Sequence, residues 1–173
     1  MKLLLHACCA PCSIQCVESV AAEGINVNLF WYNPNIYPST EYRLRKDSLC
    51  LFAEKEKLSL IIEDGETLFS AEENRCAFCY RTRLEKAARA ASEKHFDAFS
   101  TTLLISPYQN HELIKQTGEE LAADFGIEFF YRDFRPLFRK GQNQARMAGY
   151  YMQKYCGCIY SEEERNIKKS GEK

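Results

Sequence analysis

Seven of the nine cysteines in this 173-residue chain fall into three tight groups. The groups are, in chain order, Cys8-Cys9-x-x-Cys12, Cys76-x-x-Cys79 and Cys156-x-Cys158. The remaining two, Cys16 and Cys50, lie within helical patterns. We interpret them as buried thiols, because free cysteine is among the most frequently buried residue types. The three groups are therefore where we expect sulfur chemistry.

Clustered cysteines are typical of three kinds of site. Two CxxC pairs can hold a structural zinc ion, but zinc-ribbon pairs normally lie on short hairpins, whereas one pair here starts a helix after a buried strand. A CxxC at a helix N-terminus also suits a thiol oxidoreductase, because the helix dipole lowers the thiol pKa, yet that chemistry does not need two such sites. An iron–sulfur cluster takes thiolates from separated segments and leaves spare cysteines for a further metal or for electron relay. We favour the cluster, and we expect the tandem Cys8 and Cys9 to point in different directions toward different corners of it.

Composition bounds the kind of protein that carries these cysteines. The chain is 46% hydrophobic, so it can bury one good core, and we predict a single domain over 1–173 with its core over about 1–160 and a polar, frayed tail over 161–173. No apolar stretch approaches the roughly 20 residues of a membrane span, so we expect a cytoplasmic protein. In a reducing cytoplasm, clustered cysteines are more often metal ligands or catalytic thiols than disulfides. The net charge is −1, so a nucleic-acid partner would need a local basic patch.

Apolar runs alternate with helical patterns along the chain, which predicts an α/β domain with a parallel sheet of about five strands flanked by helices. The predicted strands cover 2–7, 26–33, 59–64, 97–102 and 127–131. The predicted helices cover 11–24, 38–58, 75–95, 110–125 and 141–155. Ser39 or Thr40 is the expected cap of the second helix, and Gly24 and Gly126 are expected helix ends.

The predicted strand order along the chain places the first cysteine group at a functional edge. In open α/β sheets, ligands bind beyond the carboxyl ends of the strands, where short loops lead into helices. The loop "ACCAPCS" follows the first strand, and "STTLLISPYQN" follows the fourth. Both loops should therefore lie on the rim where chemistry usually takes place.

Six segments, in order and spacing, resemble the QueH-type epoxyqueuosine reductases nearly end to end. They are "LLLHACCAPCS", "WYNPNIYPSTEYRLR", "RCAFCYRTRLEKAA", "STTLLISPYQNHELI", "YRDFRPLF" and "YYMQKYCGCIYS". The resemblance implies a HUP-type fold akin to PP-loop ATP pyrophosphatases, in which the cysteine loop replaces the glycine-rich phosphate loop after the first strand. Where those relatives present backbone amides to a pyrophosphate, this chain would present thiolates to iron.

The resemblance also implies a reaction and a set of site residues. The reaction is deoxygenation of the epoxide of epoxyqueuosine at the wobble position of tRNA, which needs two electrons, two protons and an electron donor. The implied cofactor is a [4Fe-4S] cluster with an additional adjacent iron as an option, in which iron can act as a Lewis acid. The family pattern carries over to Cys8, Cys9, Cys76 and Cys79 as cluster ligands, with Cys12 as a fifth candidate or a ligand of the neighbouring iron. Cys156 and Cys158 would be either a redox-active pair or ligands of that second iron.

Two other side chains could belong to the site. Asp133 in "YRDFR" is a candidate catalytic acid or metal ligand, but an aspartate after a strand is more often a cap or a surface charge. His6 precedes the cysteine loop, and at the end of a buried strand it is best interpreted as a hydrogen-bonded core residue.

A basic stretch interleaved with aromatic residues predicts contact with the phosphates of a tRNA anticodon loop. Its basic residues are Arg132, Arg135, Arg139, Lys140 and Arg146. A basic segment can also be an ordinary solvated surface. Two rival functions remain at this point: a zinc-stabilised nucleic-acid-binding module, and an ATP-using tRNA thiolase relative. The second lacks support because a loop of the "SGGxDS" type is missing, and brown colour against colourless zinc protein separates the first from an iron–sulfur enzyme.

Overall fold

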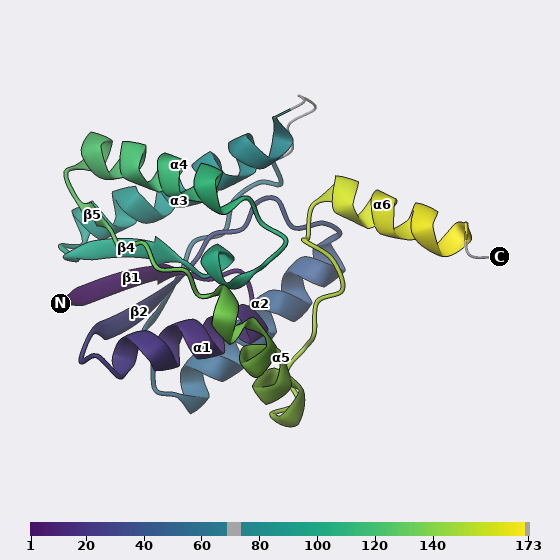
Figure 1. Cartoon of the computed structure of the whole chain (residues 1–173), viewed down its shortest axis with the longest axis horizontal. Coiled ribbons are helices and arrows are strands. Elements are labelled where there is room, and N and C mark those ends of the chain that lie inside the picture. Colours follow the sequence, from purple (N-terminus) through teal and green to yellow (C-terminus); the bar gives the residue numbers. More distant parts are fainter. Residues whose placement is uncertain (69–73, 172–173) are drawn as a thin grey trace.

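The computed structural model describes residues 1–68 and 74–171, which form an α/β fold (Figure 1). The strands are β1 (Lys2–His6), β2 (Asn26–Trp31), β3 (Leu60–Ile62), β4 (Ala98–Thr101) and β5 (Glu128–Phe129). The α-helices are α1 (Ala10–Ala21), α2 (Ser39–Lys55), α3 (Arg75–Glu93), α4 (His111–Phe125), α5 (Phe138–Met147) and α6 (Ile159–Ser170). Two short 3₁₀ helices, η1 (Thr102–Ile105) and η2 (Arg135–Leu137), complete the connections.

The five strands form one parallel sheet in the order β3-β2-β1-β4-β5. The central strand β1 is flanked on both sides, and its three leucines, Leu3, Leu4 and Leu5, are fully buried. Parallel strands covered on both faces read as continuous apolar runs, which is why "KLLL" predicts this strand correctly. The predicted parallel sheet of about five strands is confirmed, although β5 pairs over fewer residues than predicted.

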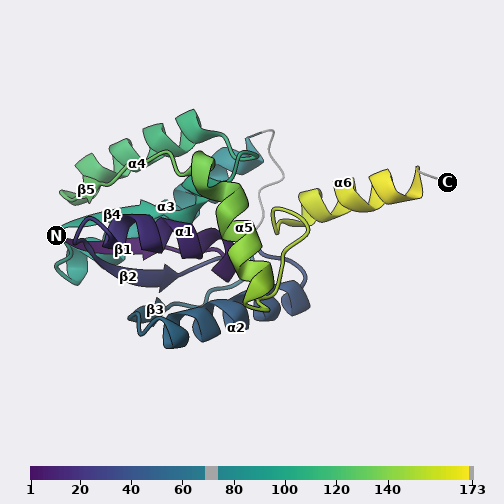
Figure 2. The ribbon, with the colours of Figure 1, turned by 60° about the horizontal axis from the view of Figure 1, so that its bottom comes forward.

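Helices cover both faces of the sheet. In Figure 1, α3 and α4 lie above the sheet, while α1 and α2 lie below it. The helix α5 packs across α1 on the outer side of that layer (Figure 2), and the fully buried Ala145 belongs to this contact region. The helix α6 projects away from the other elements in both views. No helix in the described ranges is both long and apolar enough to span a bilayer.

The C-terminus of α4 and the N-terminus of α1 follow the sequence signals, whereas the N-terminus of α2 does not. Gly126 ends α4 in the left-handed conformation with φ of 62°, as glycine after a helix does. Pro11 lies in the first turn of α1, where its missing N–H costs nothing. The prediction of Ser39 or Thr40 as a cap of α2 is wrong, because the helix already begins at Ser39 and Pro38 occupies the capping position.

The C-terminal part differs most from the sequence prediction. The helix predicted over 141–155 is wrong in its second half: α5 ends at Met147, and Gly149 then adopts a left-handed conformation with φ of 74°. The chain from 148 to 158 is irregular and leads into α6. The prediction of a frayed tail is also wrong up to residue 170, because Cys158 caps a helix there with Glu162 in its first turn and Lys168 in its last. Residues 172–173 of that tail lie outside the described ranges.

The strand order creates a crevice at the carboxyl edge. From β1 the chain turns to α1 on one face, whereas from β4 it leads through η1 to α4 on the other face. Neighbouring strands whose connections leave toward opposite faces form a topological switch point, where open α/β sheets bind their ligands. The first cysteine group lies at this point.

Candidate active site

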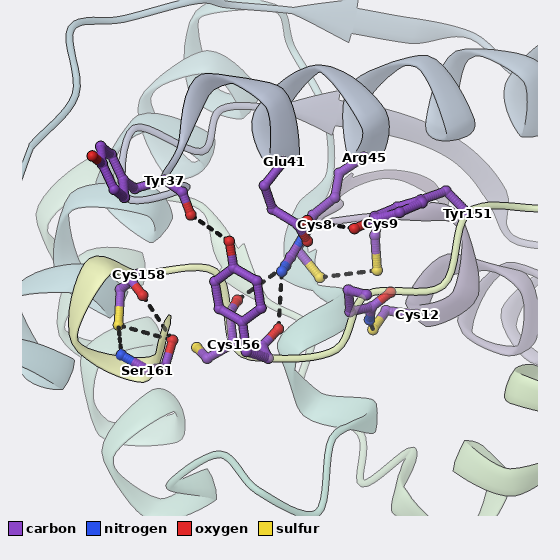
Figure 3. Close-up of polar contacts among 12 residues, drawn as sticks. Cys8, Cys9, Cys12, Tyr37, Glu41, Arg45, Tyr151, Cys156, Cys158 and Ser161 are labelled. Atoms are coloured by element: carbon purple, nitrogen blue, oxygen red, sulfur yellow. Dashed lines mark hydrogen bonds and ion pairs between the residues drawn. The ribbon is translucent and has the colours of Figure 1, made fainter. Parts of the chain in front are cut away.

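Three sulfur atoms gather at the end of β1. Cys8 and Cys9 follow the strand directly, Cys12 lies in the first turn of α1, and their Sγ atoms all lie within 4.8 Å of one another (Figure 3). The Cys8 and Cys9 sulfurs are 3.7 Å apart, so the prediction that these two side chains point in different directions is wrong. We call Cys8, Cys9 and Cys12 the cysteine triad; all three side chains are buried.

Hydrogen bonds from neighbouring strands fix the loop that carries the triad. The backbone N–H of Cys8 donates to Thr102 Oγ1 over 3.3 Å, and the Thr102 hydroxyl lies 3.7 Å from Cys8 Sγ. Asn33, which follows β2, donates through Nδ2 to the carbonyl of Ala7 over 2.9 Å. His6 is fully buried and bonds the Thr101 hydroxyl and the Tyr32 carbonyl, which confirms that it is a core residue. The triad is therefore held by a rigid edge of the sheet.

The second cysteine pair begins α3 on the other side of the crevice. A cavity of about 580 Å³ is lined by the triad members Cys8 and Cys12 and by Cys76. Cys79, one turn further along α3, lines an adjoining pocket together with Cys76. Within the described ranges, the cysteine triad is where three or more metal-ligand side chains have their ligand atoms close together. Neither Cys76 nor Cys79 belongs to that group. The structure thus places Cys8, Cys12 and Cys76 around one cavity, with Cys79 in the pocket next to it.

The third cysteine group closes the same cavity, which Cys156 and Cys158 both line. The guanidinium of Arg45 in α2 fixes this segment by donating to the Cys156 carbonyl over 3.0 Å and to the Tyr155 carbonyl over 2.9 Å (Figure 3). Gly157 has φ of 119°, and a Cβ on it would lie 3.1 Å from Arg45 Nη1. A glycine between the two cysteines is therefore required both by the backbone conformation and by the closeness of the arginine.

Cys158 is set up to carry a thiolate. Its Sγ caps the N-terminus of α6 and accepts from the backbone N–H of Ser161 over 3.4 Å. A hydrogen bond from the Cys156 thiol, followed by those from Ser161, lowers the pKa of Cys158 to about 5. The pKa of Cys156 is raised in turn, because its proton is held by that hydrogen bond to Cys158. The pair combines a thiolate with a protonated neighbour.

Two buried arginines lie beside the sulfurs. Arg45 is 1% exposed, and its Nε donates to Glu41 Oε1 over 2.7 Å. Arg83 in α3 is 2% exposed and donates from Nη1 to Cys79 Sγ over 3.5 Å. Burial opposes the charge on Arg83, but the negative charges of Cys79 and Cys8 raise its pKa above the ordinary value. The spacing of four residues from Glu41 to Arg45 and from Cys79 to Arg83 is the signal that could have indicated these contacts.

None of the five cations of the predicted basic stretch lines this cavity, and much of their charge is already paired. Three of these five cations form ion pairs with carboxylates, and these pairs are Arg132–Glu23, Arg135–Asp133 and Lys140–Glu18. Hydrogen bonds from Arg135 lower the pKa of Asp133 to about 2. Asp133 is not among the residues that line the cysteine cavity. The structure does not bring this aspartate to the sulfurs.

A different set of cations lines the cavity. Among its lining residues are Arg45, Arg75, Lys154, Arg165 and Lys168, with Glu164 as the single carboxylate. Arg75 pairs with Glu164. Within the described ranges, Lys154, Arg165 and Lys168 form no ion pair with a carboxylate. We call these last three residues the basic rim.

Comparison with known proteins places the chain in a family. The family model described as "Epoxyqueuosine reductase QueH" matches residues 3–164. This chain belongs to the QueH family. Among its relatives, the epoxyqueuosine reductase QueH of Dehalococcoides mccartyi is 33% identical over 95% of this chain and 94% of its own length. That of Acinetobacter baylyi is 38% identical over 95% of this chain and 82% of its own length, so the similarity covers most of both proteins.

A solved structure supports the fold. The U34-tRNA thiolase NcsA from Methanococcus maripaludis, determined with its [4Fe-4S] cluster, superposes with a TM-score of 0.61 at 13% identity, over 93% of this chain and 61% of that one. At this identity the likeness concerns the fold alone. It confirms that the QueH chain has the sheet architecture that its sequence resemblance implies.

The donor set fits a thiolate-bound metal centre of the kind that the family resemblance implies. Three buried thiols of the cysteine triad converge within 4.8 Å, and the triad can bind a metal. Arg83, fully buried beside Cys79, has no carboxylate in salt-bridge contact within the described part of the chain. Buried charges in proteins are paired or lie next to a metal site. Negative charge on the neighbouring sulfurs would therefore stabilise this buried cation. Thiolates, and a metal centre bound by them, supply that charge.

Proposed function

We propose that this protein is an epoxyqueuosine reductase that acts on tRNA with an iron–sulfur cluster. The reaction takes the epoxide, two electrons and two protons to an alkene and one water molecule. One observation carries the proposal: cysteines from all three separated segments line one cavity at the switch point of the sheet, with Cys9 packed beside Cys8 and Cys12 and with Cys79 in the adjoining pocket. The family match over residues 3–164 makes the same reaction the expected one.

Thiolates from two walls of the cavity are the proposed cluster ligands. We assign Cys8, Cys9, Cys76 and Cys79 to a [4Fe-4S] cluster, with Cys12 held beside them as a further ligand or as a ligand of an adjacent iron. When bound, such a cluster passes electrons, and an iron with an open position polarises a leaving oxygen. Seven thiols exceed the four that one cluster takes, so the donor set leaves sulfur for other roles.

Cys156 and Cys158 are the proposed redox pair. Two thiols that close to a disulfide release two electrons and two protons, which is the amount that removal of the epoxide oxygen consumes. Both residues line the cavity, and Cys158 has the low pKa of a reactive thiolate at a helix N-terminus. An external electron donor would restore the dithiol after each turnover. Asp133 pairs with Arg135 outside the cavity, so we leave it out of the catalytic group.

The basic rim is the proposed phosphate-contact surface for the anticodon loop. Lys154, Arg165 and Lys168 line the same cavity as the cysteines that a modified base would have to reach. Aromatic residues stand beside them: Arg165 lies 5.4 Å from the centre of the Tyr155 ring. Cations interleaved with aromatic rings suit a single strand, since phosphates meet charge and bases stack. Arg139 and Arg146 of the basic stretch, which form no ion pair in the described part of the chain, are a second candidate surface. We also propose that the protein works in the cytoplasm, where tRNA is modified.

Metal content and product formation test the proposal together. The protein is purified without oxygen, its iron and acid-labile sulfide are counted, and the digested tRNA is analysed by mass spectrometry for loss of the epoxide oxygen. We expect brown protein that converts epoxyqueuosine to queuosine in tRNA. Cys79→Ser should lose iron and activity, because a hydroxyl is a much poorer iron ligand than a thiolate.

Cys50→Ser is the matched control for that variant. Cys50 lies in α2 and is partly exposed, not buried as predicted, and it does not line the cysteine cavity. We expect this variant to keep the iron and sulfide content of the wild type. Colourless wild-type protein that contains zinc and leaves epoxyqueuosine unchanged would contradict the proposed function and favour a zinc-stabilised tRNA-binding module.

A further inference from the structure

A single arginine connects two of the cysteine groups. Arg83 donates from Nη2 to Asn33 Oδ1 over 2.8 Å and from Nη1 to Cys79 Sγ over 3.5 Å. Asn33 donates in turn to the carbonyl of Ala7, the residue before Cys8. One guanidinium therefore touches the sulfur of the second group and, through one amide, the loop that carries the cysteine triad.

Among the described residues, sulfur is the one counter-charge beside Arg83. The residue is 2% exposed, forms no ion pair with a carboxylate in the described part of the chain, and its buried Nε has no hydrogen-bond partner. Arg45, the other buried arginine at the site, differs because Glu41 neutralises it at 2.7 Å. An unpaired buried cation is strongly unfavourable by itself. It persists where a nearby centre carries the opposite charge.

We propose that Arg83 is a positioning residue of the QueH site whose uncompensated positive charge holds the cluster-binding sulfurs together and raises the reduction potential of the cluster bound to them. The inference rests on the proposed function insofar as it needs a cluster at these cysteines. Electron uptake makes such a centre more negative, and a fixed positive charge in a water-excluded site favours the more negative form. Screening is weak at this depth, so the effect is large for a single residue.

Two substitutions separate charge from shape. Arg83→Gln removes the charge and keeps a donor for Asn33, whereas Arg83→Lys keeps the charge on a different donor. Each protein is reconstituted without oxygen with ferrous iron and sulfide, and the midpoint potential is measured by spectroscopic redox titration. We expect Arg83→Gln to shift the potential to more negative values, while Arg83→Lys stays near the wild type.

The outcomes decide the inference without reference to turnover. Equal potentials in the wild type and Arg83→Gln would overturn it, and so would equal shifts in the Gln and Lys variants. If Arg83→Gln does not fold, Arg83→Met tests the same loss of charge with an apolar side chain of similar length; failure of both neutral variants to fold would show a purely structural residue and overturn the inference too. If the wild type reduces epoxyqueuosine but Arg83→Gln does not shift the midpoint potential, this inference alone is contradicted. If Arg83→Gln shifts the midpoint potential but the wild type leaves epoxyqueuosine unchanged, the proposed reaction alone is contradicted.

Discussion

Replacing Gly157 by alanine should damage the third cysteine group more than a backbone argument alone predicts. The residue has φ of 119°, which L side chains rarely adopt, and a Cβ there would meet Arg45 at 3.1 Å from Nη1 and 3.3 Å from Cζ. Strained backbone of this kind costs about 1–3 kcal/mol. Because Arg45 is buried and held by Glu41, it cannot move aside without breaking its hydrogen bonds. We therefore expect a loss near the upper end, about 3 kcal/mol, or about 6–12 °C in Tm for a chain of this length.

Gly149 provides the matched control for this measurement. It also has a positive φ, 74°, but nothing lies within 4 Å of the position of its Cβ. Gly149→Ala should therefore lose only the backbone cost of a left-handed residue, about 1–2 kcal/mol. Thermal and urea unfolding of both variants give the two free energies, and iron content shows whether the site survives. Equal losses at the two glycines would refute the reasoning, since the contact with Arg45 would then have no energetic weight.

Two further predictions concern turnover and tRNA binding. The Cys156→Ser/Cys158→Ser variant should keep its iron–sulfur absorption and lose epoxide reduction; loss of the cluster as well would reassign the pair as metal ligands. Arg165→Ala should weaken binding of an anticodon stem-loop and flatten its dependence on salt by about 0.7 in slope for one lost phosphate contact to a single strand. Arg139→Ala is the comparison for the basic stretch, and a larger change there than at Arg165 would move the phosphate path to 132–146.

Much of the scaffold was predictable because its local and global signals agree. The run Leu3 to Leu5 is apolar without a helical period, and it forms a central strand buried on both faces. Gly126 marks a helix end that the chain adopts with positive φ. The place of the first cysteine group follows from these elements, because a loop after a buried parallel strand lies at the carboxyl edge of the sheet.

Burial of polar groups was not predictable, because it depends on partners distant in sequence. Arginine is usually solvated on a helix, but the carbonyls of residues 155 and 156, which are distant in sequence, accept hydrogen bonds from the buried guanidinium of Arg45. The helix α6 has no buried residue, so packing against the core does not explain its placement. The relation of Cys8 to Cys9 also depends on loop geometry, which places sulfurs of adjacent residues 3.7 Å apart.

The two buried arginines have different roles at this site: Arg45 fixes the position of the backbone, and Arg83 acts on the reduction potential of the cluster. Arg45 is paired with Glu41, and its remaining donors fix the backbone around Cys156. In the described part of the chain Arg83 has no such carboxylate, and it contacts Cys79 directly and the loop of the cysteine triad through Asn33. Gly157→Ala should therefore lower the free energy of unfolding and displace Cys156. Arg83→Gln, which removes a charge, should shift the midpoint potential of the cluster. A potential shift caused by Gly157→Ala as large as that of Arg83→Gln would show that both arginines act through one shared effect on the sulfurs.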